Sequence, residues 1–204
     1  MTARLRMLAD DPDAERLIDA LAPGMHEAGN PFLDWMFGDG ELARTAVRRW
    51  MASERSEIAI RRVTVLEDDD VIVGAFVGVD GADMPGCARA DSVVAMAVAG
   101  RAGRAVLLQR AATLAKVRRP VALDQWLLSK LWVSPAHRGC GLGRALAREF
   151  VAQGERRGLR RCRVDARIGD AHVIRLYESV GFEQRARSAE TDPQLAVVEM
   201  VRES

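Results

Sequence analysis

The stretch that decides the fold is residues 131–146, which read LWVSPAHRGCGLGRAL. An apolar run ends at Val133, and a proline-containing turn follows. Three glycines then occupy alternate positions, Gly139, Gly141 and Gly143, ahead of apolar side chains at helical spacing. This order predicts a strand, a glycine-rich loop and the start of an amphipathic helix. Such a loop lets backbone N–H groups converge on a ligand without an intervening Cβ, and a helix N-terminus favours an anionic phosphate.

Two common phosphate-binding motifs do not fit this loop. A P-loop needs a Lys-Ser or Lys-Thr pair after its glycines, and none follows here. A dinucleotide-binding motif needs Gly or Ala at its sixth position, which is Arg144 when counted from Gly139 and Leu146 when counted from Gly141. The ligand is therefore neither a P-loop nucleotide nor a Rossmann dinucleotide.

The loop instead matches Arg-x-x-Gly-x-Gly, with Arg138, Gly141 and Gly143 at the defined positions. This resembles the pyrophosphate loop of the GNAT acetyltransferase superfamily, which holds the diphosphate of coenzyme A. Taken alone, the same six residues are also compatible with a strand–helix turn that binds nothing.

A second segment, residues 170–182, reads DAHVIRLYESVGF and continues the resemblance. It is similar to the superfamily pattern Asn-x-x-Ala-x-x-x-Tyr-x-x-x-Gly-Phe, with Asp170 in place of Asn and Val173 in place of Ala. The matching positions are Tyr177, Gly181 and Phe182. An aspartate cannot donate the amide hydrogen bond of asparagine, so we expect Asp170 to cap the helix rather than to bind the cofactor.

The resemblance implies an acetyl-CoA–dependent N-acetyltransferase and assigns roles to its residues. The backbone amide of Leu131 would stabilise the oxyanion, and Tyr177 would protonate the leaving thiolate. The implied cofactor-binding residues are Leu131, Trp132, Val133, Arg138, Gly139, Cys140, Gly141, Leu142, Gly143, Arg144, Asp170, Val173 and Tyr177. Acetyl-CoA is the expected cosubstrate, and no metal is expected.

The sequence does not single out the base that deprotonates the attacking amine. Regular alternation along the strand at 127–133 would point Leu127, Ser129, Leu131 and Val133 inward, with no carboxylate among them. The candidates are Asp124, Ser129 acting through a water molecule, and Glu67.

The acceptor is expected to be a small-molecule amine. Phe32, Trp35 and Phe37 suggest an apolar pocket, and a helical insertion at 87–120 would narrow access to it. The same aromatic residues could equally form a satellite core, and a peptide amine is the alternative acceptor. A coenzyme A–binding sensor without catalysis is a further alternative.

The elements around these motifs predict a mixed α/β fold. Strand and helix alternate after residue 123, which favours parallel pairing, and an antiparallel hairpin at 58–66 and 71–79 precedes them. We expect one GNAT-like domain over 1–204, with about six to seven strands, flanking helices and the helical insertion before the cofactor-binding strand. The other expected elements are a strand at 4–9, helices at 12–26 (capped by Asp11), 41–55, 142–154 and 171–180, and strands at 123–133, 161–167 and 195–201. Gly181 is expected to end the last helix, and Phe182 to begin the strand that follows it.

Composition sets limits on the class of protein. The chain has 204 residues, 49% of them apolar, and a net charge of +1, which disfavours nucleic-acid binding despite its arginine-rich blocks. Three scattered cysteines, Cys87, Cys140 and Cys162, show no metal-binding spacing. We expect a cytoplasmic protein that does not bind membranes and that could form a homodimer.

Overall fold

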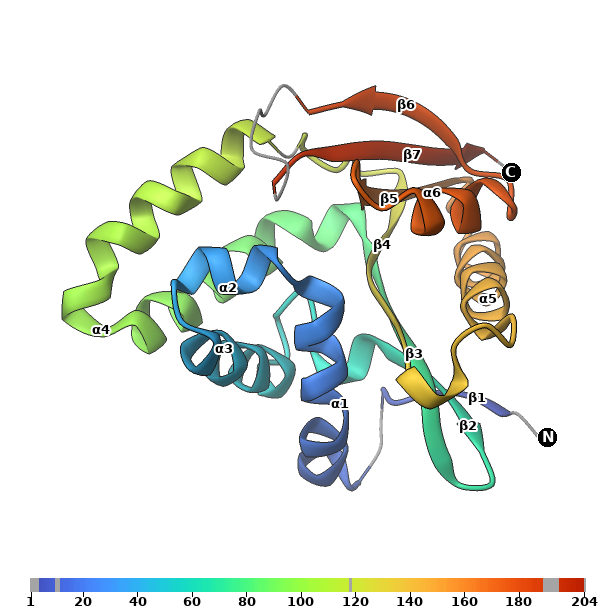
Figure 1. Cartoon of the computed structure of the whole chain (residues 1–204), viewed down its shortest axis with the longest axis horizontal. Coiled ribbons are helices and arrows are strands. Elements are labelled where there is room, and N and C mark those ends of the chain that lie inside the picture. The colour runs from blue at the N-terminus through green and yellow to red at the C-terminus, as the bar shows by residue number, and fades with distance from the viewer. Residues whose placement is uncertain (1–3, 10–11, 118, 189–194, 204) are drawn as a thin grey trace.

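The computed structural model describes residues 4–9, 12–117, 119–188 and 195–203. Its centre is a seven-stranded sheet in the order β1-β2-β3-β4-β5-β7-β6 (Figure 1). Neighbouring strands run antiparallel except β4 and β5, which are parallel. The strands are β1 (Arg4–Met7), β2 (Val63–Asp68), β3 (Val71–Asp80), β4 (Gln125–Val133), β5 (Arg161–Arg167), β6 (Glu183–Arg187) and β7 (Val197–Glu203).

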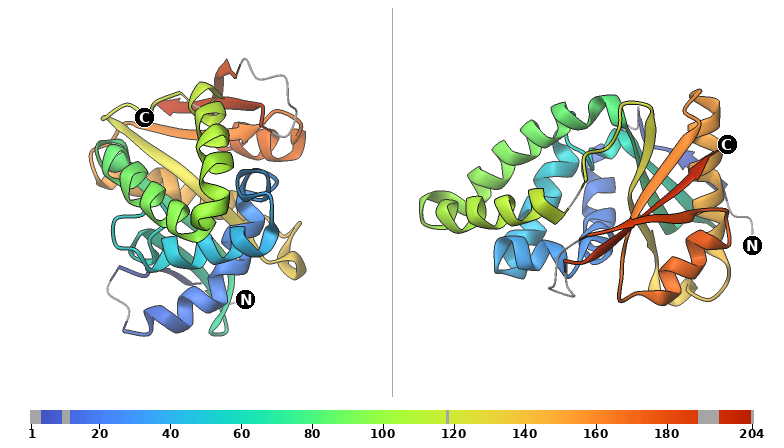
Figure 2. Two further views of the ribbon diagram at one scale, coloured as in Figure 1. Left: turned by 90° about the vertical axis from the view of Figure 1, so that its left-hand side faces the viewer. Right: turned by 90° about the horizontal axis from the view of Figure 1, so that it is seen from above.

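Helices cover both faces of the sheet (Figures 1 and 2). On one face lie α1 (Ala14–Gly29), α2 (Phe32–Phe37), α3 (Gly40–Ala52) and α4 (Met84–Val117). On the other lie α5 (Leu142–Arg156) and α6 (Ala171–Glu178). Short 3-10 turns occur at Ile60–Arg62, Gly81–Asp83 and Pro135–His137. The predicted mixed α/β architecture with flanking helices is confirmed.

Each face of the sheet has its own hydrophobic core. The α5-side core includes Phe76, Trp126, Leu128, Leu146, Phe150, Val164 and Tyr177. The α1-side core includes Leu21, Met25, Val47, Val65, Val77 and Leu127. Adjacent residues of one strand alternate between these cores, as the twofold periodicity of a strand requires. The sheet is therefore buried on both sides where the central strands pair.

The predicted hairpin is confirmed, although its first strand is shorter than expected. Residues 60–62 form a 3-10 turn, so β2 begins at Val63 rather than at residue 58. Asp69 and Asp70 make the turn with positive φ angles of 48° and 62°. A short polar side chain tolerates this left-handed conformation better than a branched one, which explains why aspartates suit the turn.

The predicted helical insertion is α4, which follows β3. At Gly100 the backbone is not helical (φ 61°, ψ −174°), so two helical segments meet at a kink. Glycine adopts this φ without a steric penalty. Figures 1 and 2 show the insertion extending away from the sheet, beside α2 and α3. Only five of its residues are buried: Cys87, Ala95, Leu107, Leu114 and Val117.

The two ends of the described chain differ in detail from expectation. The predicted cap Asp11 lies outside the described residues, and α1 begins at Ala14 and runs to Gly29, past Pro23. The strand expected at 195–201 corresponds to β7, and the strand expected after Gly181 corresponds to β6, which begins at Glu183 and forms the edge of the sheet. Among the described helices, none has the length and apolar character needed to cross a membrane.

Candidate active site

The glycine loop connects the end of β4 to the start of α5. Gly139 and Gly141 both have a φ of 80°, in the region that favours glycine. A Cβ at either position would meet no other atom within 4 Å, so this left-handed backbone borders open space rather than packed protein. Gly143 differs, because a Cβ there would lie 2.9 Å from Leu176 Cδ1. Gly143 therefore allows α5 and α6 to approach each other.

The N-terminus of α5 supplies backbone donors beside these glycines. Gly141 is the N-cap, and the first helical hydrogen bond runs from the Ala145 N–H to its carbonyl oxygen at 3.1 Å. No side chain from the described part of the chain caps this helix. The N–H groups of Leu142, Gly143 and Arg144 thus remain at the positive end of the helix dipole, where an anion is stabilised.

The two arginines that flank the loop have partners within the chain. Arg138 donates through Nε to the Val133 carbonyl oxygen at 3.0 Å and pairs with Glu27 of α1. Arg144 donates through Nε to the Ser179 hydroxyl at 3.1 Å. Both contacts hold the loop against neighbouring elements.

The strands β4 and β5 separate in front of the loop. Their parallel pairing covers Gln125–Leu128 and Arg161–Val164. Beyond these rungs the two strands, both described in full, no longer pair with each other. There β4 remains paired with β3 as far as Val133, and β5 remains paired with β7 as far as Arg167. The two strands thus diverge between their last shared rung and the glycine loop, and we call this divergence the slot.

A bulge in β4 changes which side chains face each side. The register shifts between Val77 and Gly78 of β3, opposite Lys130 and Leu128, so Ser129 is the extra residue. Leu131 and Val133 pack against the α5-side core, whereas Leu127 and Trp132 belong with the α1-side core. The expected alternation, in which Leu127, Ser129, Leu131 and Val133 share one face, is therefore wrong.

Trp132 turns its side chain toward α1. A Cβ at Gly24 would lie 2.5 Å from Trp132 Cδ2, and the indole Nε1 donates to Glu27 Oε2 at 2.9 Å. The Trp132 indole therefore packs against α1. Cys140, in the loop itself, is exposed, and its Sγ lies 3.8 Å from the Arg138 carbonyl oxygen.

The second motif forms α6 and packs on the α5-side core. Asp170 is its N-cap, and the carboxylate accepts the Val173 N–H at 3.1 Å, which is the capping role expected of it. Val173 is half-buried against the core. Tyr177 is 5% exposed and its ring lies 5.7 Å from that of Phe182. Burial raises the pKa of the Tyr177 phenol well above its usual range, so this group stays protonated.

Two of the candidate bases lie away from the divergence of β4 and β5. Asp124 precedes β4 at its far end and forms an exposed ion pair with Arg161. Glu67 is on β2, separated from β4 by β3, and pairs with Arg6 at 2.7 Å. The carboxylate that does reach the divergence is Glu57, which accepts a hydrogen bond from the Ser129 hydroxyl. Sequence reasoning missed it because Glu57 lies 72 positions from Ser129 and outside any motif.

The aromatic residues of α2 divide between core and surface. Phe32 and Phe37 pack against the α1-side core, and the Phe37 ring lies 5.7 Å from that of Trp50. The Arg110 guanidinium carbon lies over the Trp35 ring, 5.7 Å from the centre of that ring. Phe37 also borders a hollow of about 200 Å3 between α2 and α4, which is otherwise lined by Met36, Gly38, Leu42, Ala99, Gly103, Val106, Leu107 and Arg110.

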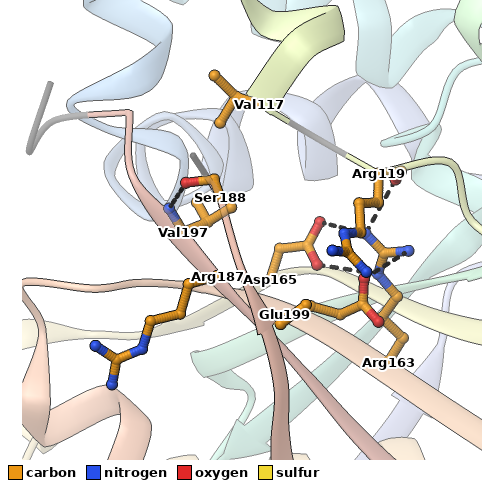
Figure 3. Close-up of a pocket in the computed structure, with 9 residues that line it drawn as sticks. Val117, Arg119, Arg163, Asp165, Arg187, Ser188, Val197 and Glu199 are labelled. Atoms are coloured by element: carbon orange, nitrogen blue, oxygen red, sulfur yellow. Dashed lines mark hydrogen bonds and ion pairs between the residues drawn. The ribbon is translucent and has the colours of Figure 1, made fainter. Parts of the chain in front are cut away.

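A second hollow lies over β5 and β7 and encloses only about 20 Å3 (Figure 3). Arg163, 2% exposed, extends into it and donates to Asp165 at 3.0 Å and to the carbonyl oxygens of Pro120 and Arg119 at 2.9 and 3.0 Å. Glu199 lies 3.5 Å from the same guanidinium. With room for about one water molecule, this hollow is a structural junction between the α4–β4 connection and β5.

Within the described ranges, no three His, Cys, Asp or Glu side chains gather closely enough to hold a metal ion. The three cysteines are unpaired. Cys87 and Cys162 are buried, and burial raises the pKa of the Cys162 thiol to about 11. Cys87 and Cys162 therefore serve as packed side chains of the hydrophobic cores.

Comparison with known families decides the assignment. The family model described as Acetyltransferase (GNAT) family matches residues 24–182. The chain belongs to this family. The matched GNAT region contains α2 to α6, the diverging strands and the glycine loop.

Individual relatives of this GNAT protein are more distant. The ribosomal protein bS18-alanine N-acetyltransferase of Escherichia coli (strain K12) is 38% identical over 64 residues, which is 31% of this chain. The chain spans 43% of the length of that curated relative. An agmatine N-acetyltransferase structure has a TM-score of 0.61 at 19% identity, covering 99% of this chain and all of the other. The PaiA N-acetyltransferase of Thermoplasma acidophilum, solved with coenzyme A, has a TM-score of 0.57 at 13% identity and full coverage of both chains. At such identities these two structures show the shared fold.

Proposed function

We propose that this GNAT protein transfers an acetyl group from acetyl-CoA to a primary amine by direct attack in a ternary complex. The observation that carries the proposal is the position of the glycine loop. Two left-handed glycines bordering open space, Gly139 and Gly141, lead into the uncapped N-terminus of α5 where β4 has left β5. A diphosphate at the loop and an extended arm between the strands fit this arrangement.

The residues present fit acetyl-CoA, which supplies an acetyl group activated as a thioester. The N–H groups of Leu142, Gly143 and Arg144 would bind the diphosphate, with Gly139, Cys140 and Gly141 contributing backbone. From Val133 back to Ser129, at about 3.3 Å per residue, β4 offers about 13 Å of strand edge to the pantetheine arm. The Val133 carbonyl accepts one hydrogen bond from Arg138 and has a second lone pair, so the arm can bond to backbone groups from Leu131 to Val133.

Two residues would act on the thioester. The Leu131 amide would hydrogen-bond the oxyanion that forms as the amine attacks, which is where a fixed donor lowers the barrier most. Tyr177 would donate a proton to the departing thiolate. Burial raises the pKa of its phenol above the usual range, so the proton is present at neutral pH. The acetyl group moves directly to the amine, so no acyl-enzyme on Cys140 is needed.

We propose a small-molecule amine as the acceptor. The hollow of about 200 Å3 beside Phe37 is compact, largely apolar and bordered by one cation, Arg110, and the α4 insertion forms one wall of it. The related agmatine N-acetyltransferase acts on a small amine. The second candidate is a peptide amine, which the named activity of the bS18-alanine N-acetyltransferase favours.

Thiol release from acetyl-CoA tests the function and separates these acceptors. The purified chain would be offered agmatine, a panel of other small primary amines, and a peptide that begins with alanine. Turnover with small amines and none with the peptide supports the proposal in full. Turnover with the peptide alone moves the acceptor to the protein class. Tight acetyl-CoA binding without turnover on any amine would indicate a sensor and would contradict the enzymatic proposal.

A further inference from the structure

A group of polar side chains lies on the α1 side of the sheet where β4 leaves β5. It consists of Glu57, Asp91, Ser129 and Lys130, which come from the α3–β2 connection, from α4 and from β4. We call it the bulge cluster. All four residues are half-buried. None belongs to either motif of the cofactor loop or α6.

The bulge itself brings two polar residues of β4 to this side. Ser129 follows Leu128, the last residue of β4 that pairs with β5, so its hydroxyl lies at the narrow end of the divergence. Because Ser129 is the bulged residue, Lys130 stays on the same face: a Cβ at Gly29 of α1 would lie 3.3 Å from Lys130 Cε. Its ammonium lies 3.3 Å from the Ser129 carbonyl oxygen and 3.5 Å from the hydroxyl.

Glu57 is held so that its carboxylate meets Ser129. The Ser129 hydroxyl donates to Glu57 Oε1. The backbone N–H of Glu57 donates to Asp91 Oδ2 at 3.1 Å, and the Asp91 carbonyl oxygen accepts from Trp50 Nε1 at 3.0 Å. These contacts from α3 and α4 fix the backbone from which the Glu57 side chain projects. An oriented carboxylate behind a hydroxyl is an arrangement that can accept a proton through that hydroxyl.

The divergence of the strands places this hydroxyl next to the reaction. The diphosphate end of acetyl-CoA would lie at the glycine loop, beyond Val133, and an extended arm along β4 would run back toward the last rung at Leu128. The thioester would then reach the narrow end of the slot. An amine approaching from the α1 side would meet the Ser129 hydroxyl there.

We propose that Ser129 and Glu57 form the proton relay that deprotonates the acceptor amine, an inference that rests on the proposed acetyl transfer. As the amine nitrogen bonds to the thioester carbon, its proton passes to Ser129 Oγ, and the proton of Ser129 passes to the Glu57 carboxylate. The C–S bond then breaks, and the thiolate leaves with its electron pair and takes a proton from Tyr177. Ser129 touches the acceptor, whereas Glu57 acts through Ser129 and is a positioning residue. Asp91 orients Glu57.

The test compares Ser129→Ala and Glu57→Gln with the wild type, using thiol release with the best acceptor of the amine and peptide panel. We expect kcat to fall about 10²- to 10⁴-fold in both variants, as for loss of a general base. The calorimetric Kd for acetyl-CoA should remain unchanged, which shows that the fold and cofactor site persist. Ser129→Thr, which keeps a hydroxyl, should recover most of the rate.

The pH profile separates a relay from a merely structural role. Without the relay, the amine must lose its proton to solvent, so the rate of either variant should keep rising with pH where the wild type has levelled off. Glu67→Gln is the matched control, because Glu67 is likewise a half-buried carboxylate but lies on β2, where it pairs with Arg6. It should retain the wild-type rate and profile.

Three results would overturn the relay. Wild-type rates in Glu57→Gln and Ser129→Ala would do so while leaving the acetyltransferase function intact. So would a loss of rate with an unchanged pH profile, which indicates a structural effect. Absence of thiol release from the wild type with every acceptor would contradict the proposed function and the relay together.

Discussion

Glu27 of α1 and Arg138 of the glycine loop, 111 positions apart in the sequence, form an ion pair across the edge of the divergence between β4 and β5. The other oxygen of Glu27 accepts from Trp132 Nε1 at 2.9 Å. Arg138 in turn donates to the Val133 carbonyl oxygen. One carboxylate on the α1 side of the sheet thus contacts both the end of β4 and the glycine loop.

Glu27→Gln should therefore weaken acetyl-CoA binding as well as stability. The hydrogen bond from Arg138 lowers the pKa of Glu27, so its contribution is present above the unfolded pKa, about 4.3, and is lost as pH falls through the lower folded value. Because the pair is half-exposed, we expect a loss of at most about 1 kcal/mol at pH 7 and a Kd for acetyl-CoA about 2- to 5-fold weaker. Urea unfolding measures the change in stability, and calorimetry measures the Kd for acetyl-CoA.

Glu41→Gln is the control, since Glu41 pairs with Arg44 at 2.5 Å on α3, away from the loop. It should leave the Kd unchanged. An equal change in Kd for both variants would show that the Glu27 contact does not act on the loop.

The parts of the fold that follow local patterns could be predicted from the sequence. The hairpin, the α4 insertion, the order of β4, α5, β5 and α6, and the capping role of Asp170 rest on residues close together in the chain. Element ends were less predictable, because α1 continues to Gly29 through the Pro23–Gly24 pair and a 3-10 turn delays β2 until Val63.

What could not be predicted depends on contacts between distant segments. A one-residue bulge at Ser129 has no sequence signature here, yet it reverses the face of every later residue of β4. Arg138 and Arg144 match positions beside a phosphate loop, but their partners Glu27 and Ser179 come from other elements. Glu57 belongs to no motif and reaches Ser129 only because α3 and α4 pack on the sheet.

Asp91 should make stability depend on pH. Burial is the main reason that the pKa of Asp91 is raised to about 6. The negative charge of Glu57 raises this pKa further, and the positive charge of Lys130 lowers it. The Cys87 thiol also lies close enough to Asp91 to interact with it. The folded protein thus holds the proton more tightly than the unfolded chain, so stability present below about pH 4 is lost as pH rises toward 6.

For a partly solvated group we expect that loss to be about 1–2 kcal/mol, less than the full value of a shift of about two units. Asp91→Asn should remove this dependence in urea unfolding between pH 4 and 7. If Asp91→Asn kept the pH dependence of the wild-type free energy of unfolding, a group other than Asp91 would be responsible for it.

Arg163→Ala should be strongly destabilising, because it leaves the carboxylates of Asp165 and Glu199 buried without their cation (Figure 3). Breaking a buried pair in this way costs about 3–5 kcal/mol. Adding Asp165→Asn to Arg163→Ala should recover part of the lost free energy of unfolding, because it removes one of the unpaired charges. Arg185→Ala, which removes an exposed pair with Glu183, should change the free energy of unfolding by no more than about 0.5 kcal/mol. Similar losses in both variants would contradict the structural role given to Arg163.

Tyr177→Phe removes one hydroxyl and retains the ring that packs against Phe182. If the phenol protonates the leaving thiolate, kcat should fall about 100-fold or more while the Kd for acetyl-CoA changes little. The melting temperature serves as the control for packing. An unchanged kcat would show that Tyr177 serves only the core.

The most direct test of the account is acetyl-CoA binding by calorimetry on the wild type, Gly141→Glu and Gly158→Glu. Gly141 and Gly158 share a left-handed backbone (φ 80° and 75°) and open space around a Cβ, but only Gly141 lies in the loop. We predict micromolar binding, about −8 kcal/mol, for the wild type and Gly158→Glu, and none for Gly141→Glu. Failure of the wild type to bind, or equal binding by all three proteins, would contradict the assignment of the glycine loop as the cofactor site.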